Sequence, residues 1–335
     1  MTVIVQSDDY TAMLEQAAQF IRSNDHFLVV SHVQPDGDAA GSTYAVAWML
    51  QSLGKTFTLI NEGPIPDKFI YMAADRHSVV HYEADPGSVT QRYTRVISVD
   101  CADYSRIGSV HKLFAEDVQL LNIDHHATND RFGSSNLVLE QAAATVEVLY
   151  DLCVHMEIPF THELNVCIYS GLLTDTGGFR YANTTPKVMQ IAADMLNRGV
   201  KGHELAERLL EKLSYPQISL IKTSLSTLSF AHSNRVAWLS VTLNDVKASG
   251  ASNEDLDGLV NYPRNIEGVE VGVLFKERGE GIVKVSLRSN GRADVAKVAK
   301  SFGGGGHVRA AGCAVQGTPE EAIERVVKEV GLALE

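Results

Sequence analysis

The sequence predicts an α/β fold, with a parallel-sheet domain joined by a helical linker to a smaller α+β C-terminal domain. Helical and strand-like segments alternate along the first part of the chain, as in βαβ units with a parallel sheet covered by helices. Beyond residue 216, strand-like runs are followed by one closing helix, which is typical of an α+β domain. The 335 residues, of which 45% are hydrophobic and 21% charged, suffice for two cores.

The elements of the first part follow from hydrophobic spacing. Apolar residues recur at helical intervals in 10–23 and in 39–54, where Gly54 ends the pattern. Four short apolar or β-branched runs predict strands at 26–31, 55–61, 94–100 and 118–124. Segment 104–115 separates the last two of these runs.

The rest of the chain divides into a helical stretch and a second domain. Helical patterns run from about Gln141 to Leu213, and include 143–157 and 185–199. Strands are expected at 235–241, 268–277 and 282–289, and a helix at 318–330. We therefore expect a first domain over 1–190, a helical linker over 191–215 and a smaller domain over 216–335.

Charge and cysteine usage limit the class of protein. Residues 1–215 carry 15 basic and 27 acidic side chains, whereas residues 216–335 carry 14 of each, so the net charge of −12 belongs to the first part. This charge argues against duplex nucleic acid as a partner. The start MTVIVQSDDY lacks a basic leader pattern, no apolar run approaches a membrane span, and the four separated cysteines form no C-x-x-C pair. We expect a cytoplasmic protein with reduced thiols and no membrane partner; a homodimer is kept open.

Acidic and imidazole groups follow three of the predicted strands. The first strand leads into the stretch HVQPDGD, the third ends at Asp100, and the fourth ends at Asp124, with two histidines behind it. Asp175 follows a helical run. Ligands of open parallel sheets bind at the carboxyl ends of the strands, and carboxylates crowded there repel one another unless they are protonated or bind cations. Taken singly, PDGD could be a surface turn, Asp100 a cap and the histidines surface residues; together they predict a metal site.

The donor types indicate which metal. Imidazoles and carboxylates without a thiolate favour Mn²⁺, with Mg²⁺, Co²⁺ or Fe²⁺ as alternatives, over structural zinc. Six candidate ligands are too many for one ion that keeps a place for water. Two divalent cations bridged by a carboxylate are the usual arrangement for in-line displacement at phosphorus.

Four stretches, HVQPDGDAAGS, VDCAD, IDHH and TDTGGFRY, resemble in order and spacing the motifs of the DHH phosphoesterases. Residues 286–312, SLRSNGRADVAKVAKSFGGGGHVRAAG, resemble the glycine-rich signature of the associated C-terminal domain. The resemblance covers nearly the whole chain. It is strongest to the nanoRNase branch of this family, whose members also remove the 3′-phosphate from 3′-phosphoadenosine 5′-phosphate (pAp).

The resemblance implies a role for each matching residue. His32, Asp36 and Asp100 would hold one cation, and Asp100 would also join the ligands of the other, which are Asp38, His125 and Asp175. Asp124 would support the histidine pair, and His126 would face the scissile phosphate as a hydrogen-bond donor or acid. In VDCAD, strand alternation directs Cys101 away from Asp100, so this thiol is not expected to be a ligand.

The glycine-rich stretch predicts a substrate site in the second domain. Consecutive glycines are unfavourable in a connector, but they let backbone N–H groups approach an anion; a flexible surface loop is the alternative. The resemblance implies that Arg288 and His307 bind substrate, with Arg264 as a weaker candidate whose alternative is a solvated arginine. The whole expected set is Arg264, Arg288, Ser289, Gly303, Gly304, Gly305, Gly306 and His307.

These features predict a two-metal phosphoesterase in which water attacks phosphorus in line, without a covalent enzyme intermediate. The expected substrates are short single-stranded RNA, dinucleotides such as pApA, and pAp. Three alternatives remain: a manganese inorganic pyrophosphatase or polyphosphatase, a RecJ-like single-strand exonuclease, and a nucleotide-binding module without turnover. The glycine-rich signature disfavours the first, the chain length the second and the intact ligand set the third.

Overall fold

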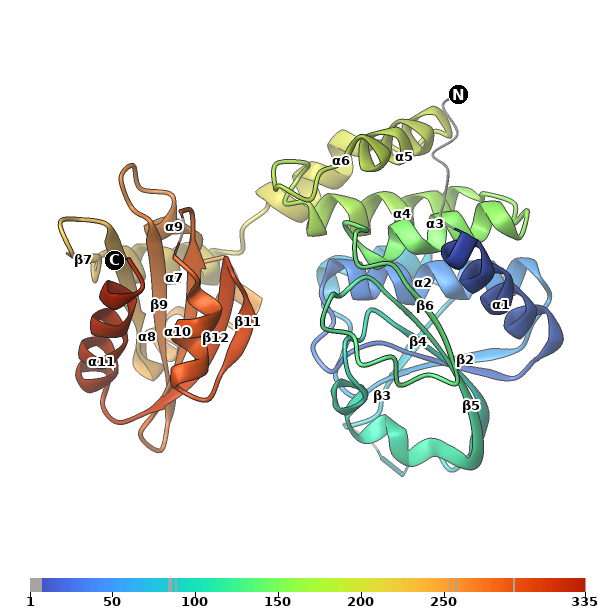
Figure 1. The fold of residues 1–335 in the computed structure, drawn as a ribbon, viewed down its shortest axis with the longest axis horizontal. Helices are drawn as coiled ribbons and strands as arrows, with labels where there is room; N and C mark the ends of the chain where they lie inside the picture. Colours follow the sequence, from blue (N-terminus) through green and yellow to red (C-terminus); the bar gives the residue numbers. More distant parts are fainter. Residues whose placement is uncertain are drawn as a thin grey trace. The chain divides into compact units, whose positions relative to one another are not determined.

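The computed structural model describes residues 8–334, with the exception of 84, 85, 88, 253, 257 and 292. The chain forms two compact units, and the boundary between them along the sequence lies between Lys212 and Leu213 (Figure 1). Residues 191–212, expected in the linker, therefore belong to the first unit. The start of the chain, in which we recognised no leader pattern, lies outside the described residues up to position 7.

A six-stranded parallel sheet forms the centre of the first unit, in the order β3-β2-β1-β4-β5-β6. The four predicted strands are confirmed, while the short outer strands β3 and β6 were missed. The strand order reverses between β1 and β4, and ligands of such sheets bind where the order reverses. The bounds are β1 Phe27–Val30, β2 Phe57–Asn61, β3 Val79–His81, β4 Tyr93–Val99, β5 Phe114–Asp124 and β6 Ser135–Val138.

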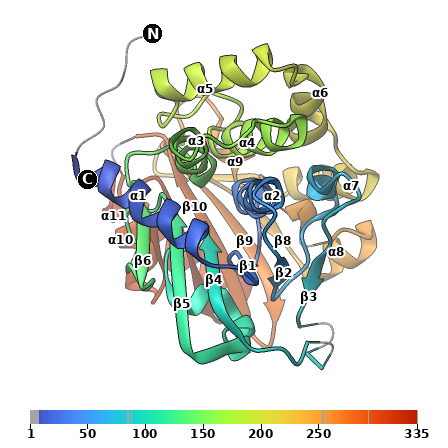
Figure 2. The same ribbon diagram turned by 90° about the vertical axis from the view of Figure 1, so that its right-hand side faces the viewer.

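Helices and the 3₁₀ turn η1 cover one face of this sheet, and the 3₁₀ turn η2 packs on the other. Helices α1 to α4 lie on the first face, with α5 in a further layer beyond α3 and α4 (Figures 1 and 2). On the second face, Ile107 and Val110 of η2 pack with Leu28 and Val30 of β1. The bounds are α1 Asp8–Ser23, α2 Gly37–Ser52, η1 Asp67–Ala73, η2 Tyr104–Leu113, α3 Thr145–His155, α4 His162–Asp175, α5 Pro186–Asn197, α6 Gly202–Ala206 and the π-helical turn η3 Glu207–Glu211.

Two glycines allow α2 and α4 to approach closely. A Cβ atom on Gly41 would lie 3.0 Å from the carbonyl oxygen of Cys167, and one on Gly171 would lie 2.9 Å from Oδ1 of Asp38. The close approach brings the start of α2, which carries Asp38, beside the end of α4, which carries Asp175.

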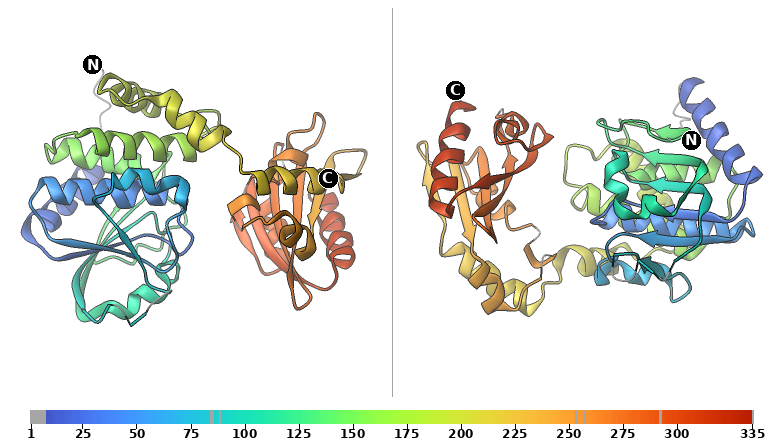
Figure 3. Two further views of the ribbon diagram at one scale, coloured as in Figure 1. Left: turned by 180° about the vertical axis from the view of Figure 1, so that it is seen from behind. Right: turned by 90° about the horizontal axis from the view of Figure 1, so that it is seen from below.

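The second unit contains a mixed six-stranded sheet in the order β11-β12-β10-β9-β8-β7. Within the described part of this second sheet, the β8–β9 pair is parallel and the other pairs are antiparallel. Helices α10 and α11 pack on one face, and α7 and η4 contribute to the core on the other (Figure 3). The bounds are α7 Tyr215–Leu225, β7 Ser229–Ala231, β8 Val236–Val241, α8 Leu243–Ser249, η4 Glu254–Leu256, α9 Asn261–Arg264, β9 Val271–Gly279, β10 Ile282–Ser289, α10 Val295–Ser301, β11 Gly305–His307, β12 Ala310–Gln316 and α11 Pro319–Leu332.

The predicted strands of the second unit and its closing helix are confirmed, whereas the helices α7, α8, α9 and α10 and the strands β7, β11 and β12 were not foreseen. All four cysteines are free, as expected, and all four are buried. Among the residues that the structure describes, no helix combines the length and the apolar character that crossing a bilayer requires.

Candidate metal centre

Three strand ends bring imidazole and carboxylate groups together at one edge of the first unit's sheet. His32 follows β1, Asp100 follows β4 directly, and His125 follows β5 directly. Nε2 of His32 lies 3.6 Å from Oδ2 of Asp100, and Nε2 of His125 lies 3.7 Å from Oδ1 of the same carboxylate. The sheet therefore unites side chains that are far apart in sequence.

The helices complete the cluster. Nε2 of His125 lies 3.9 Å from Oδ2 of Asp38, at the start of α2, and 3.6 Å from Oδ2 of Asp175, at the end of α4. Three overlapping groups have ligand atoms within 4.8 Å of one another, and these groups are placed so that they could hold a metal ion: His32, Asp36 and Asp100; Asp38, His125 and Asp175; and Asp100, His125 and His126.

Asp100 occupies the centre of this cluster. Only 2% of the residue is exposed, and its φ angle of 53° is in the left-handed region. Such a conformation is uncommon for a residue other than glycine, costs about 1–3 kcal/mol, and occurs preferentially at functional sites. Its Oδ2 is near His32, while its Oδ1 is near His125 and His126, so its two oxygens belong to different groups.

The PDGD stretch gives its two carboxylates different environments. Oδ1 of Asp36 accepts hydrogen bonds from the backbone N–H groups of Asp38 and Ala39, both at 3.1 Å, and so caps α2. Oδ2 of Asp36 takes no part in this cap. Asp38 is completely buried, and its oxygens accept the backbone N–H groups of Thr145 at 2.5 Å and Val146 at 3.1 Å.

Burial and mutual repulsion shift the carboxyl pKa values. Burial, followed by the charges of Asp100 and Asp36, raises the pKa of Asp38 well above its ordinary value. Burial and the charges of Asp38, Asp36 and Asp100 raise the pKa of Asp175 in the same way. Burial alone would raise the pKa of Asp100, but its hydrogen bond to His32 and the nearby histidines lower it overall. Divalent cations would relieve this repulsion, so the donor set fits hard or borderline metal ions.

The two consecutive histidines are held by different partners. Nδ1 of His125 lies 3.2 Å from the carbonyl oxygen of Ala142, so Nε2 is directed to the carboxylates. Nδ1 of His126 lies 2.8 Å from Oδ1 of the fully buried Asp124, whose Oδ2 accepts the Asn129 side-chain amide at 2.6 Å. Burial opposes protonation of His126, but the hydrogen bond to Asp124 raises its pKa.

Sequence reasoning missed two residues that hold the predicted ligands. Thr145 contacts both Asp38 and Asp100, and Asn129 contacts Asp124. Asn129 follows the IDHH motif closely, which is a weak signal for it, whereas Thr145 was only the third residue of the predicted helical segment 143–157. The thiol of Cys101, as expected, is directed elsewhere, because its Sγ lies 3.3 Å from the carbonyl oxygen of Asp103.

In the second unit, the predicted substrate residues occupy one row of the sheet. Arg288 of β10 pairs with Ala310 of β12, which in turn pairs with His307 of β11. Directly paired antiparallel residues direct their side chains to the same face. Gly272 of β9 extends this row, and a Cβ atom there would lie 2.5 Å from the backbone nitrogen of Arg264. The row therefore brings two arginines and a histidine to the face opposite α10 and α11.

The glycine run is partly a strand rather than a loop. Gly305 and Gly306 belong to β11, and Gly303 and Gly304 connect it to α10. Gly306 has a φ angle of 142°, and a Cβ atom on it would lie 2.5 Å from the carbonyl oxygen of Ala310. Close strand approach thus requires glycine here. Ser289, next to Arg288, is buried, and its backbone N–H donates to the carbonyl of Arg309 at 3.0 Å.

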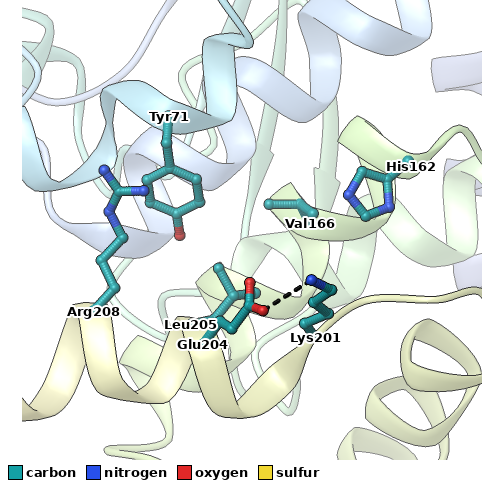
Figure 4. A pocket seen from close by; sticks show the side chains of 7 residues that line it. All are labelled: Tyr71, His162, Val166, Lys201, Glu204, Leu205 and Arg208. Carbon is teal, nitrogen blue, oxygen red and sulfur yellow. Dashed lines mark hydrogen bonds and ion pairs between the residues drawn. The ribbon is translucent and has the colours of Figure 1, made fainter.

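A separate cavity of about 260 Å³ lies in the first unit (Figure 4). None of the predicted site residues lines it. Lys201 is paired with Glu204 at 2.9 Å, and the guanidinium of Arg208 lies 4.3 Å from the centre of the Tyr71 ring. Its lining residues are Tyr71, His162, Val166, Lys201, Glu204, Leu205 and Arg208.

Comparison with known proteins agrees with both units. Residues 26–172 match the model of the DHH family, N-terminal domain, and residues 236–335 match the DHHA1 domain. A Thermus thermophilus protein named bifunctional oligoribonuclease and PAP phosphatase NrnA is 37% identical over 304 residues, which are 90% of this chain and 88% of that protein. A Streptococcus mutans protein named as a probable enzyme of the same kind is 26% identical, over 87% of this chain and 90% of that protein.

A solved structure shares the whole fold. The crystal structure of an exopolyphosphatase-related protein from Bacteroides fragilis superposes with a TM-score of 0.89 and 25% identity, and covers 100% of both chains. The DHH match contains seven of the eight site residues predicted in the first unit, and the eighth, Asp175, follows the end of the match by three positions. From the paired domains and the 37% identical relative, it follows that the chain belongs to the DHH family of phosphoesterases, with a DHHA1 domain in its second unit.

Proposed function

We propose that the chain hydrolyses short single-stranded oligoribonucleotides and dinucleotides such as pApA, and removes the 3′-phosphate of pAp. The observation that carries the proposal is the position of Asp100 between two histidines. Its Oδ2 lies 3.6 Å from Nε2 of His32, and its Oδ1 lies 3.7 Å from Nε2 of His125. Such sharing supports a pair of cations, which is the usual arrangement for displacement at phosphorus. The names of the relatives support the choice of substrates.

We assign His32, Asp36 and Asp100 to one cation and Asp38, Asp100, His125 and Asp175 to the other. Mn²⁺ is the proposed ion, because the set combines imidazoles with carboxylates and has no thiolate. When bound, the cations would supply Lewis acidity to the phosphoryl group and lower the pKa of water. The protein's contribution is to hold six side chains in place before substrate arrives.

His126 and Asp124 have a separate role in the proposed mechanism. Asp124 accepts the Nδ1 proton of His126, which leaves Nε2 to donate to a phosphoryl oxygen or to the leaving group. Asn129 in turn fixes the Asp124 carboxylate. His126 is therefore the proposed catalytic donor.

The row in the second unit is proposed to bind the nucleotide part of the substrate. Arg288, His307 and Arg264 supply positive charge, and the backbone of 303–306 supplies polar contacts. Ser289, the neighbour of Arg288 in β10, is directed to the opposite face of the sheet and is assigned no contact. A neutral second domain with a local cationic row can bind an anion although the whole chain is negative. Single strands suit such a site better than duplexes because their bases are open to contact. The four free cysteines fit the reducing cytoplasm.

One assay panel tests the proposal. We would compare pAp, pApA, a five-nucleotide RNA and pyrophosphate in Mn²⁺, with EDTA as the blank. Turnover of the three nucleotides, dependent on metal and clearly faster than that of pyrophosphate, is the expected result. Pyrophosphate is included because the Bacteroides fragilis protein is described as exopolyphosphatase-related. Preferential pyrophosphate hydrolysis, or nucleotide binding without turnover, would overturn the proposal.

A further inference from the structure

We infer that Thr145 is a positioning residue for two carboxylates of the second cation site, which we define as Asp38, Asp100, His125 and Asp175. Its backbone N–H orients Asp38, and its hydroxyl orients Asp100. The inference rests on the proposed function, because it concerns how the same centre is assembled. Thr145 is completely buried at the first position of α3 and contacts both carboxylates. It would therefore determine how tightly the second cation is held.

The backbone of Thr145 acts on Asp38. Helix α3 begins after Ala144, which has no side chain that can cap it. Asp38 provides the cap from 107 residues away, with Oδ2 accepting the N–H of Thr145 at 2.5 Å and Oδ1 accepting that of Val146 at 3.1 Å. A carboxylate whose two oxygens accept two N–H groups at a helix N-terminus is held in a fixed plane. The same Oδ2 lies 3.9 Å from Nε2 of His125.

The hydroxyl of Thr145 acts on Asp100. Oγ1 donates to Oδ1 of Asp100 at 2.9 Å, and this oxygen is the one near His125 and His126. The torsion that rotates an aspartate carboxylate has a broad, weak preference, so an unrestrained carboxylate would sample many planes. The hydroxyl uses one lone pair of Oδ1 and leaves the other for a cation. The hydrogen bond therefore restricts the bridging carboxylate without replacing its ligand function.

Threonine supplies a hydroxyl donor at this position. Among its few χ1 rotamers, the one present in the structure directs the hydroxyl at Asp100. Valine has the same shape and keeps the backbone N–H that Asp38 accepts, but it lacks the donor. The Thr145→Val variant consequently removes one hydrogen bond and leaves the helix cap in place. Thr145→Ser restores the donor.

The test measures metal binding as well as activity. We would titrate Mn²⁺ into the metal-free full-length chain by calorimetry, and record the electron paramagnetic resonance spectrum at one and two equivalents, for wild type, Thr145→Val and Thr145→Ser. The matched control is Thr43→Val, because Thr43 is equally buried in α2 and its Oγ1 donates to the backbone carbonyl of Ala39, at 2.8 Å. Unfolding of the metal-free variants reports general damage.

Wild type should bind two Mn²⁺ ions and show the multiline spectrum of a coupled pair. Thr145→Val should weaken the second Mn²⁺ about 10- to 100-fold, the usual effect of removing a residue that orients a ligand, and should shift the one-equivalent and two-equivalent spectra toward isolated ions. Thr145→Ser should recover most of the lost Mn²⁺ affinity, and Thr43→Val should bind Mn²⁺ like wild type.

Three results would overturn the inference while the proposed function stands: unchanged Mn²⁺ affinity in Thr145→Val, no rescue by serine, or an equal loss in Thr43→Val. A wild-type chain that binds fewer than two Mn²⁺ ions would instead contradict the proposed function itself. If Thr145→Val fails to fold, Thr145→Ser decides, because it keeps the donor and loses only a methyl group. Its second Mn²⁺ affinity should then remain within about threefold of wild type, and a tenfold loss would overturn the inference.

Discussion

Nε2 of His32 lies 3.6 Å from Oδ2 of Asp100, whereas the other oxygen of this carboxylate serves the groups that follow β5. Asp100 is thus shared by the two proposed ligand sets, one containing His32 and the other containing His125. Its left-handed backbone, with a φ angle of 53°, directs it into the cluster straight after a strand. This geometry makes the residue the sharpest single test of a two-cation centre.

Asp100→Asn should reduce turnover of pApA by about a thousandfold or more, because an amide is a poor ligand and the change affects both cations. Asparagine tolerates left-handed backbone, so the fold should be retained. The measurement is kcat with saturating Mn²⁺, together with circular dichroism. Asp117→Asn, on an exposed part of β5, is the control and should keep wild-type activity. A variant at Asp100 that kept a tenth of the wild-type rate would disprove the bridging assignment.

Asp175→Asn should stabilise the metal-free protein, by about 1 kcal/mol or more at pH 7.5. Its raised pKa means that the folded state binds this proton more tightly than the unfolded state, whose pKa is near 3.8. The contribution of Asp175 to the free energy of unfolding of wild type is therefore greatest at low pH. It falls as the pH rises from about 3.8, the pKa in the unfolded state, through the raised pKa of the folded state. The advantage of the variant should accordingly be smaller at pH 5.5 than at pH 7.5.

Urea unfolding in EDTA at the two pH values measures this effect, and the same experiment in Mn²⁺ provides its control. Mn²⁺ should stabilise wild type strongly and Asp175→Asn weakly, since a ligand that binds only the folded state adds to its stability. If the variant is less stable than wild type in EDTA at pH 7.5, carboxylate repulsion at Asp175 is not the dominant effect.

His126→Ala should lower kcat about 10²- to 10⁴-fold, which is the usual contribution of a positioned proton donor. Calorimetry should still give two Mn²⁺ ions per chain, because His126 is assigned to the substrate and not to a cation. His155→Ala, at the end of α3, is the control. Loss of one Mn²⁺ ion would instead make His126 a ligand, together with Asp100 and His125, a group that the distances also permit.

The sequence predicted the parts of the fold that depend on local patterns. The β-branched run before Asp100 and the one before Asp124 could be recognised alone, and their shared sheet edge followed from the rule for parallel strands. Three-residue strands such as β3 and β11 were missed because they contain too few residues for a period to be visible. The glycines of β11 suggested a loop, although close strand pairing explains Gly306.

Interactions between distant segments could not be predicted in this way. The cap that Asp38 provides for α3 joins residues 107 positions apart, and no local pattern indicates it. The same holds for Gly272, whose missing side chain makes room for Arg264 beside the row of Arg288. The positions of the proposed ligands thus followed from motif and topology, whereas the residues that contact these side chains required the structure.

His307→Ala should separate substrate binding from chemistry. If His307 and Arg288 bind the nucleotide part while the first unit supplies the chemistry, the variant should lower kcat/KM for pApA at least about tenfold. Hydrolysis of bis-p-nitrophenyl phosphate, which has no nucleotide to bind, should change much less, because remote binding interactions contribute only for substrates that can make them.

Mn²⁺ affinity, measured by calorimetry, should stay at the wild-type value. Lys328→Ala, on the exposed side of α11, serves as the matched control and should affect neither substrate. Equal losses for both substrates, or a parallel loss of Mn²⁺ binding, would assign His307 to the catalytic centre and refute the division of roles.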